Sequence, residues 1–177
     1  MIACDYETIT QRCARVLGRH ARDVLAKMSS ITDLAEELTL ETARRNTSYS
    51  EAVKVSFRGK SPHGPVDGFF ICAFHSYRLA EDLARDIAVR MGLGPELADT
   101  REGVDNVLAE LLNIIIGLTS ADWIKIGLDI SFDPPEKLGG HQIQPIALGA
   151  AVYLLTLKLD PQREISLFEA FRLREPE

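Results

Sequence analysis

Apolar and polar positions alternate along the chain with either a helical or a strand-like period. Residues 5–28 have apolar side chains every three or four positions and a row of arginines on the opposite side, which predicts an amphipathic helix. The arginines of this row are Arg12, Arg15, Arg19 and Arg22. Steps of three and four recur over residues 31–38 behind a possible N-cap, Ser30, and predict a short second helix.

Two strand-like segments and a helix are predicted next. Residues 51–57 alternate apolar and polar side chains, residues 67–74 are apolar and aromatic, and Ser-Pro-His-Gly-Pro lies between them. This pattern predicts a β-hairpin with a longer loop. A period of 3.6 then runs from a plausible N-cap, Ser76, to Gly92, which is suited to a C-terminal cap, and predicts a helix.

The second half of the chain is predicted to contain one apolar helix and three strands. Asp99 and Glu102 resemble a capping box, so we expect the helix to begin there and to end near Gly117. The three segments with strand-like patterns are residues 122–132, 147–159 and 164–173. Grouped helices and grouped strands indicate the α+β class, with helices packed against an antiparallel or mixed sheet.

Length and composition fit one domain over residues 1–177. The chain is 46% hydrophobic and 26% charged, which is enough to close one sizeable core. Its net charge of -6 argues against a nucleic-acid partner, and the arginine row, flanked by acidic residues and without interleaved aromatics, is interpreted as a solvated helix face rather than an anion-binding stripe. Without an evident signal sequence or a bilayer-length apolar run, we expect a cytoplasmic protein and no membrane partner.

Cysteines and histidines do not form a recognisable site. Cys4, Cys13 and Cys72 are an odd number without a Cys-x-x-Cys pair, so we expect reduced, mostly buried thiols. The four histidines are widely spaced, and none has the His-x-x-x-His spacing of a metal site. We therefore expect no metal held by this chain.

One side of the apolar helix carries the candidate site. Nine aliphatic residues fill a broad arc of the helical wheel, and we expect this arc, which includes Ile114 and Leu118, to be buried. The remaining arc holds Gly103, Asn106, Ala109, Glu110, Asn113 and Gly117. Glu110 and Asn113 lie one turn apart there, with Cβ atoms roughly 5–6 Å apart.

The surroundings of this pair distinguish it from an ordinary solvated helix face, which is the alternative interpretation. No Lys or Arg occurs between Arg101 and Lys125, whereas a solvated face normally mixes charges of both signs. Its neighbours include Gly103, Ala109 and Gly117, which are small enough for another molecule's backbone to approach.

An amide next to a carboxylate limits the possible chemistry. The pair lacks the base and nucleophile of a catalytic triad, and Asn replaces His poorly as a metal ligand. The amide of Asn113 can both accept and donate hydrogen bonds, so it can orient a water for in-line attack on a phosphoryl group. Glu110 would repel a phosphoryl group, so we expect it to bind a cation such as a lysine of a protein substrate.

The pattern Glu110-x-x-Asn113-x-x-x-Gly117, followed by Phe-Asp-Pro-Pro-Glu-Lys-Leu-Gly-Gly from Phe132, resembles the CheC/CheX phosphatases of bacterial chemotaxis. The order of elements is also similar over about residues 51–172. The resemblance implies that the helix docks on a phosphorylated CheY-like response regulator, where Asn113 orients the attacking water and Glu110 anchors a lysine of the partner. Asn106, Ala109 and Gly117 would then line the binding surface.

The resemblance also implies the cofactor and the assembly. Mg²⁺ is expected on the response regulator, and no cofactor is expected on this chain. Because the chain has a single motif, it resembles the CheX type, for which a homodimer is expected. Two departures from the family pattern are Asn106, where Asp or Ser is common, and residues 1–50, which match poorly. They leave open the alternative of a non-catalytic CheX-like module for binding or dimerisation in two-component signalling.

Overall fold

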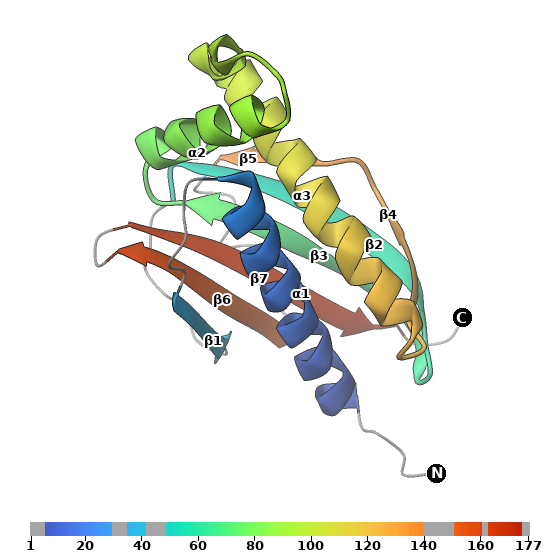
Figure 1. Ribbon diagram of the computed structural model, residues 1–177. Coiled ribbons are helices and arrows are strands. Elements are labelled where there is room, and N and C mark those ends of the chain that lie inside the picture. Colours follow the sequence, from blue (N-terminus) through green and yellow to red (C-terminus); the bar gives the residue numbers. More distant parts are fainter. Residues whose placement is uncertain (1–5, 30–34, 42–48, 140–150, 161–162, 175–177) are drawn as a thin grey trace.

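The computed structural model of the chain describes residues 6–29, 35–41, 49–139, 151–160 and 163–174 (Figure 1). These residues form three α-helices, one 3-10 helix (η1) and seven strands. In chain order they are α1 (Tyr6–Met28), β1 (Ala35–Glu41), β2 (Glu51–Ser61), β3 (Gly64–Phe74), α2 (Tyr77–Arg90), η1 (Pro95–Asp99), α3 (Arg101–Ile124), β4 (Asp129–Phe132), β5 (Glu136–Gly139), β6 (Ala151–Asp160) and β7 (Arg163–Leu173).

The seven strands form a single sheet. Its order is β1-β6-β7-β3-β2-β4, and β5 also pairs with β2. Every pairing among the described strands is antiparallel. Together with the helices packed on it, this sheet confirms the predicted α+β class.

The helices cover one face of the sheet. Figure 1 shows α1 and α3 lying side by side across it, with α2 near the end of the sheet where α3 begins. Trp123 of α3 is completely buried there, and its ring centroid lies 5.2 Å from that of Phe70, 5.4 Å from that of Phe171 and 6.1 Å from that of Phe57. The expectation that Trp123 anchors the helix to the sheet is therefore confirmed.

Several predicted elements are present where the patterns place them. The amphipathic helix is α1, and α2 begins behind Ser76, whose side chain accepts a hydrogen bond from the Leu79 N–H. Gly92 follows α2 with a φ of +75°, the conformation expected of a capping glycine. Cys13 and Cys72 are free and buried, as expected, whereas Cys4 lies outside the described residues.

The β2–β3 hairpin is confirmed, but its turn is shorter than predicted. Ser61 pairs directly with Gly64, so only Pro62 and His63 connect the strands. The hydroxyl of Ser61 accepts a hydrogen bond from the His63 N–H at 3.1 Å and donates one to the Gly64 carbonyl at 2.9 Å. Gly64 has a φ of +127°, which a side chain would disfavour, and this makes the tight turn possible.

The short second helix predicted over residues 31–38 is wrong for its described part. Residues 35–41 form strand β1, which pairs antiparallel with β6 from Ala35–Lys158 to Glu41–Val152. Leu38 and Leu40 also have the period of two that a strand requires, and the pairing with a strand more than 100 positions away decides between the two patterns. Residues 31–34 lie outside the described chain.

Helix α3 is longer than predicted and begins with a different cap. Thr100 is the N-cap rather than Asp99, and its hydroxyl accepts a hydrogen bond from the Gly103 N–H at 3.1 Å. The helix continues past Gly117 to Ile124, so the strand predicted from residue 122 is reduced to β4. Gly127 is the terminating glycine, with a φ of +86° and with the next N–H bonded to the Trp123 carbonyl at 3.0 Å.

By length and composition α3 is the one helix in the described part of the chain that could cross a membrane. Its aliphatic side chains, however, pack in the core between the helices and the sheet, among them Val104, Leu108, Leu111 and Ile115. A central helix of a globular core meets the same criteria of length and composition. We therefore assign α3 to the core.

Candidate functional site

The outer side of α3 presents both members of the predicted pair. Glu110 and Asn113 are exposed, and neither side chain forms a hydrogen bond or ion pair within the described structure. Asn106 and Gly117 are exposed as well, and Ala109 is half-buried. No heavy atom lies within 4 Å of the position that a Cβ atom would take on Gly117, so the space above it is open.

Two expectations about this helix are wrong in detail. Gly103 is buried, because the carbonyl oxygen of Leu97 in η1 lies 1.6 Å from the position of an added Cβ, so this glycine serves internal packing. Leu118, expected in the buried arc, is 46% exposed, and Ile114 is half-buried. The wheel misplaced these two residues because α1 and the sheet cover a narrower arc of α3 than its aliphatic residues span.

The open side of α3 continues beyond the predicted pair. Its exposed positions follow one another at steps of three or four residues, with Leu118 adjacent. We call this surface the α3 strip, and it consists of Asn106, Glu110, Asn113, Gly117, Leu118, Ala121 and Ile124. Glu110 is its only charged residue, and the exposed carboxylate of Glu102 lies one further step before Asn106.

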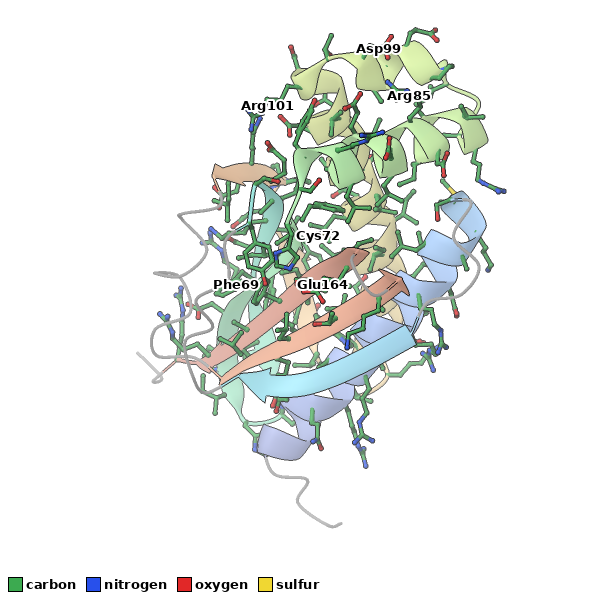
Figure 2. All side chains as sticks on the ribbon, turned by 90° about the vertical axis from the view of Figure 1, so that its left-hand side faces the viewer. Phe69, Cys72, Arg85, Asp99, Arg101 and Glu164 are labelled. Atoms are coloured by element: carbon green, nitrogen blue, oxygen red, sulfur yellow. The ribbon has the colours of Figure 1, made fainter. Side chains whose placement is uncertain are left out.

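Ion pairs bind two charged residues near the beginning of α3 to the sheet. Arg101 pairs with Glu51 of β2, and Lys137 of β5 pairs with Asp105. Figure 2 shows Arg101 above β5, away from the Arg85 and Asp99 side chains that join α2 to η1. These cations are therefore engaged within the chain.

A second group of ion pairs surrounds Asp122 near the end of α3. Its carboxylate accepts hydrogen bonds of 2.6 Å from Arg19 and from Lys125, the residue that follows α3. It also lies 2.9 Å from a ring nitrogen of His20. The hydrogen bonds from Lys125 and His20 lower the pKa of Asp122 from 3.8 to about 2. Asp122 is thus ionised at neutral pH, and it ties α1 to α3.

The charges in and beside the α3 strip determine which ligands it can bind. Arg101, Asp105, Asp122 and Lys125 are paired within the chain, whereas Glu110 is an exposed carboxylate in no ion pair beside an amide. Glu102, two turns before Glu110, is a second exposed carboxylate of α3 in no ion pair within the described structure. No group of three or more His, Cys, Asp or Glu suitable for a metal is present among the described residues. The arrangement can therefore attract a cation at Glu110 and hold a polar ligand, such as water, at Asn113.

The exposed polar pair was predictable from the sequence, whereas the residues around it were not. How far α1 and β4 cover α3 determines the exposure of Leu118 and Ile124. The position of β5 determines the pairing of Lys137 with Asp105. The only signal in the sequence was the 3.6-residue spacing of Gly117, Ala121 and Ile124, which the predicted helix end concealed.

Comparison with known proteins identifies the fold. No protein-family model matches the sequence, and no curated protein matches it. Among solved structures, a chain of the CheX–CheY–BeF3–Mg²⁺ complex from Borrelia burgdorferi matches with a TM-score of 0.71 at 19% identity, covering 96% of this chain and 99% of that chain.

Two further structures give the same result. A CheC-like superfamily protein from Shewanella sp. PV-4 matches with a TM-score of 0.67 at 13% identity, covering 90% of this chain and 97% of that chain. CheX from Desulfovibrio desulfuricans matches with a TM-score of 0.65 at 15% identity, covering 92% and 99%. The chain therefore has a CheX-like α+β fold, and the resemblance seen in the sequence is confirmed at the level of the fold.

Proposed function

We propose, from a CheX-like fold that presents Glu110 and Asn113 on an open helix face, that this chain hydrolyses the aspartyl phosphate of a CheY-like response regulator. The observation that carries the proposal is the free, exposed state of these two side chains, one turn apart. The structure from Borrelia burgdorferi supports the choice of partner, since it contains CheY with BeF3 and magnesium.

The reaction needs only a positioned water and a stabilised phosphoryl group. Asn113 accepts a hydrogen bond from the water through its carbonyl and donates one through its amino group, so that the water oxygen lies in line with the bond between phosphorus and the aspartyl oxygen of the acyl phosphate. The new bond joins the water oxygen to phosphorus, and the bond from phosphorus to the aspartyl oxygen breaks. The electron pair remains on the aspartate carboxylate, and the proton of the water leaves with phosphate or solvent.

Glu110 supplies binding rather than chemistry. Its carboxylate pairs with a lysine of the response regulator and thereby fixes Asn113 over the phosphoryl group. The divalent cation that phosphoryl transfer requires is carried by the response regulator, where it neutralises the phosphoryl oxygens. Holding the water in this geometry is worth at least about a hundredfold in rate.

The experiment that tests the proposal measures the decay of phosphorylated receiver domains. A panel of CheY-type receivers is phosphorylated with a small acyl-phosphate donor, and phosphate release is followed with and without this protein. We expect one receiver to lose its phosphate faster, and we expect Asn113→Ala to abolish the acceleration while circular dichroism and the unfolding midpoint stay unchanged. Unchanged acceleration by Asn113→Ala would exclude the proposal.

The same experiment distinguishes the proposed phosphatase from the alternative, a non-catalytic binding module. Asn106, which occupies a position where Asp or Ser is common in the resembling family, is the observation that favours this alternative. A module that only binds would associate with the phosphorylated receiver without shortening the lifetime of its phosphate.

Dimerisation of the chain is proposed for both the phosphatase and the binding module. Analytical ultracentrifugation measures it through the sedimentation coefficient.

A further inference from the structure

The arginine row of α1 forms a basic stripe on the outer side of the helix layer. Its members are the exposed residues Arg12, Arg15, Arg19 and Arg22. They follow one another at steps of three or four residues and lie within about 80° of the helix circumference. Leu17 and Val24, which are buried, lie on the opposite side of α1. The row therefore points away from the sheet and into solvent.

Basic and acidic residues are separated between the outer sides of α1 and α3. Residues 8–22 contain no Asp or Glu, and Asp23 is the one acidic residue among the exposed positions from Gln11 to Lys27. On α3, which lies beside α1 in Figure 1, no Lys or Arg occurs between Arg101 and Lys125. Helix faces that are only solvated normally mix both signs of charge. A basic face on a chain with a net charge of -6 therefore indicates a more specific role.

Two arginines of the row are engaged by carboxylates of the chain and two are not. Arg19 lies 2.6 Å from Asp122 and Arg22 lies 3.7 Å from Asp23, and their side chains remain 52% and 44% exposed. Arg12 and Arg15 form no hydrogen bond or ion pair within the described structure. A guanidinium group can bind a carboxylate through two parallel N–H donors. The first half of the row is thus available to carboxylates of another molecule.

The spacing of the row favours a helix as the source of those carboxylates. From Arg12 to Arg22 the row extends about 15 Å along the helix axis, in three steps of about 5 Å. Carboxylates at every third or fourth position of a second helix repeat with the same steps. On an extended strand, side chains of one face are about 6.6 Å apart, so three steps span about 20 Å and lose the register.

A membrane and a nucleic acid fit the row less well. The exposed positions of α1 from Gln11 to Lys27 include no apolar side chain larger than that of Ala26, whereas a helix that lies on a bilayer buries large apolar residues. No aromatic residue lies among these positions to stack on bases. The exposed carboxylates of Glu102 and Glu110 on neighbouring α3 would also repel an extended polyanion.

We propose that the arginine row of α1 is a docking surface for an acidic helix of another protein, whose carboxylates lie opposite Arg12 and Arg15 and continue toward Arg22. Exposed ion pairs contribute little affinity each, so the row steers and selects the partner and does not hold it tightly. The proposal concerns α1 alone, and it stands whether or not Asn113 of α3 takes part in hydrolysis.

The test uses a fluorescent, helix-forming peptide with Glu at every third or fourth position, and its binding to the full chain is measured by fluorescence anisotropy at low salt. Arg12→Gln and Arg15→Gln are combined in one variant. Arg78→Gln and Arg90→Gln are combined in a matched control, which removes two exposed arginines of α2 that are in no ion pair within the described structure. We expect Kd to rise about tenfold in the α1 variant and less than about twofold in the α2 control.

Three further results decide the proposal. Equal weakening in the α1 variant and the α2 control would mean that the peptide responds to overall charge, and it would overturn the proposal. A peptide of the same charge with proline residues, which cannot form a helix, should bind more weakly, and equal affinity would overturn the helical register. Tighter binding of a DNA duplex or of phosphatidylglycerol vesicles, lost in the α1 variant, would assign the row to a nucleic acid or a membrane instead.

Discussion

The guanidinium group of Arg19 donates a hydrogen bond of 2.6 Å to the carboxylate of Asp122, joining α1 to α3 across 103 positions of sequence. His20 contacts the same carboxylate from α1, and so does Lys125, which follows α3 directly. Asp122 is thus the point at which the helix that carries the candidate site is tied to its neighbour. It also engages one residue of the arginine row, which otherwise lies exposed on α1.

We predict that Asp122→Asn lowers the stability of the fold in a pH-dependent manner. The pKa of Asp122 is lowered in the folded state from 3.8 to about 2, so its stabilising effect is present above pH 4 and is lost as the pH falls toward 2. Urea unfolding midpoints should therefore be lower for the variant at pH 7, and the difference should shrink below pH 3. Asp23→Asn, which removes a more exposed carboxylate on α1, is the control and should show a smaller effect.

The two glycines of α3 should respond oppositely to alanine. Gly103→Ala places a methyl group against the Leu97 carbonyl and should destabilise the protein by about 1–3 kcal/mol. Gly117→Ala meets open space and should stabilise the helix by up to about 1 kcal/mol. Denaturant unfolding measures both, and similar signs for the two variants would contradict the packing described here.

Gly117→Ala also tests the function of the strip. If the backbone of a response regulator approaches Gly117, the added methyl group reduces receiver binding although it stabilises the fold. We expect a higher unfolding midpoint together with weaker acceleration of dephosphorylation. A gain in stability with full phosphatase activity would show that the partner does not approach this glycine.

Much of the fold could be predicted from the sequence, because local periodicity determines it. The spacing of apolar residues located α1 and α2, alternation located β2, an apolar and aromatic run located β3, and a strand-like pattern located β7. The end of α3 was misplaced because Gly117 looked like a cap. Gly117 does not end the helix, because the buried side of α3 continues to pack in the core from Ile116 to Trp123.

Elements that depend on distant partners could not be predicted in this way. Strand β1 exists through its pairing with β6, and a sequence with both helical and strand-like spacing does not contain that information. The candidate pair was predictable, since Glu110 and Asn113 stand out on a helical wheel. The ion pairs beside them were not, because Glu51 and Lys137 lie 50 and 32 positions from their partners.

Replacement of Glu110 should affect binding more than turnover. Glu110→Gln keeps the shape of the side chain but removes its charge, so we expect the KM for the phosphorylated receiver to rise about tenfold, equivalent to about 1.4 kcal/mol, while kcat changes little. The wild-type KM should increase with salt, and that of Glu110→Gln should depend on salt less. Glu102→Gln, also exposed on α3 but outside the strip, is the control. A large fall in kcat with unchanged KM would assign Glu110 a role in the chemistry.

The carboxyl group of Glu169 makes stability fall as the pH rises. It lies on the helix-facing side of β7, next to Cys13 of α1 and opposite Tyr153 of β6. Its side chain is 1% exposed and has no hydrogen-bond partner among the described residues. Burial raises its pKa well above 4.5, so the folded state holds a proton that the unfolded state releases above pH 4.5. Within that window the group lowers the free energy of unfolding by about 1.4 kcal/mol per pH unit. Glu169→Gln should remove this slope in urea titrations and Glu96→Gln, an exposed control, should keep it; equal slopes in all three proteins would mean that Glu169 is ionised in the fold.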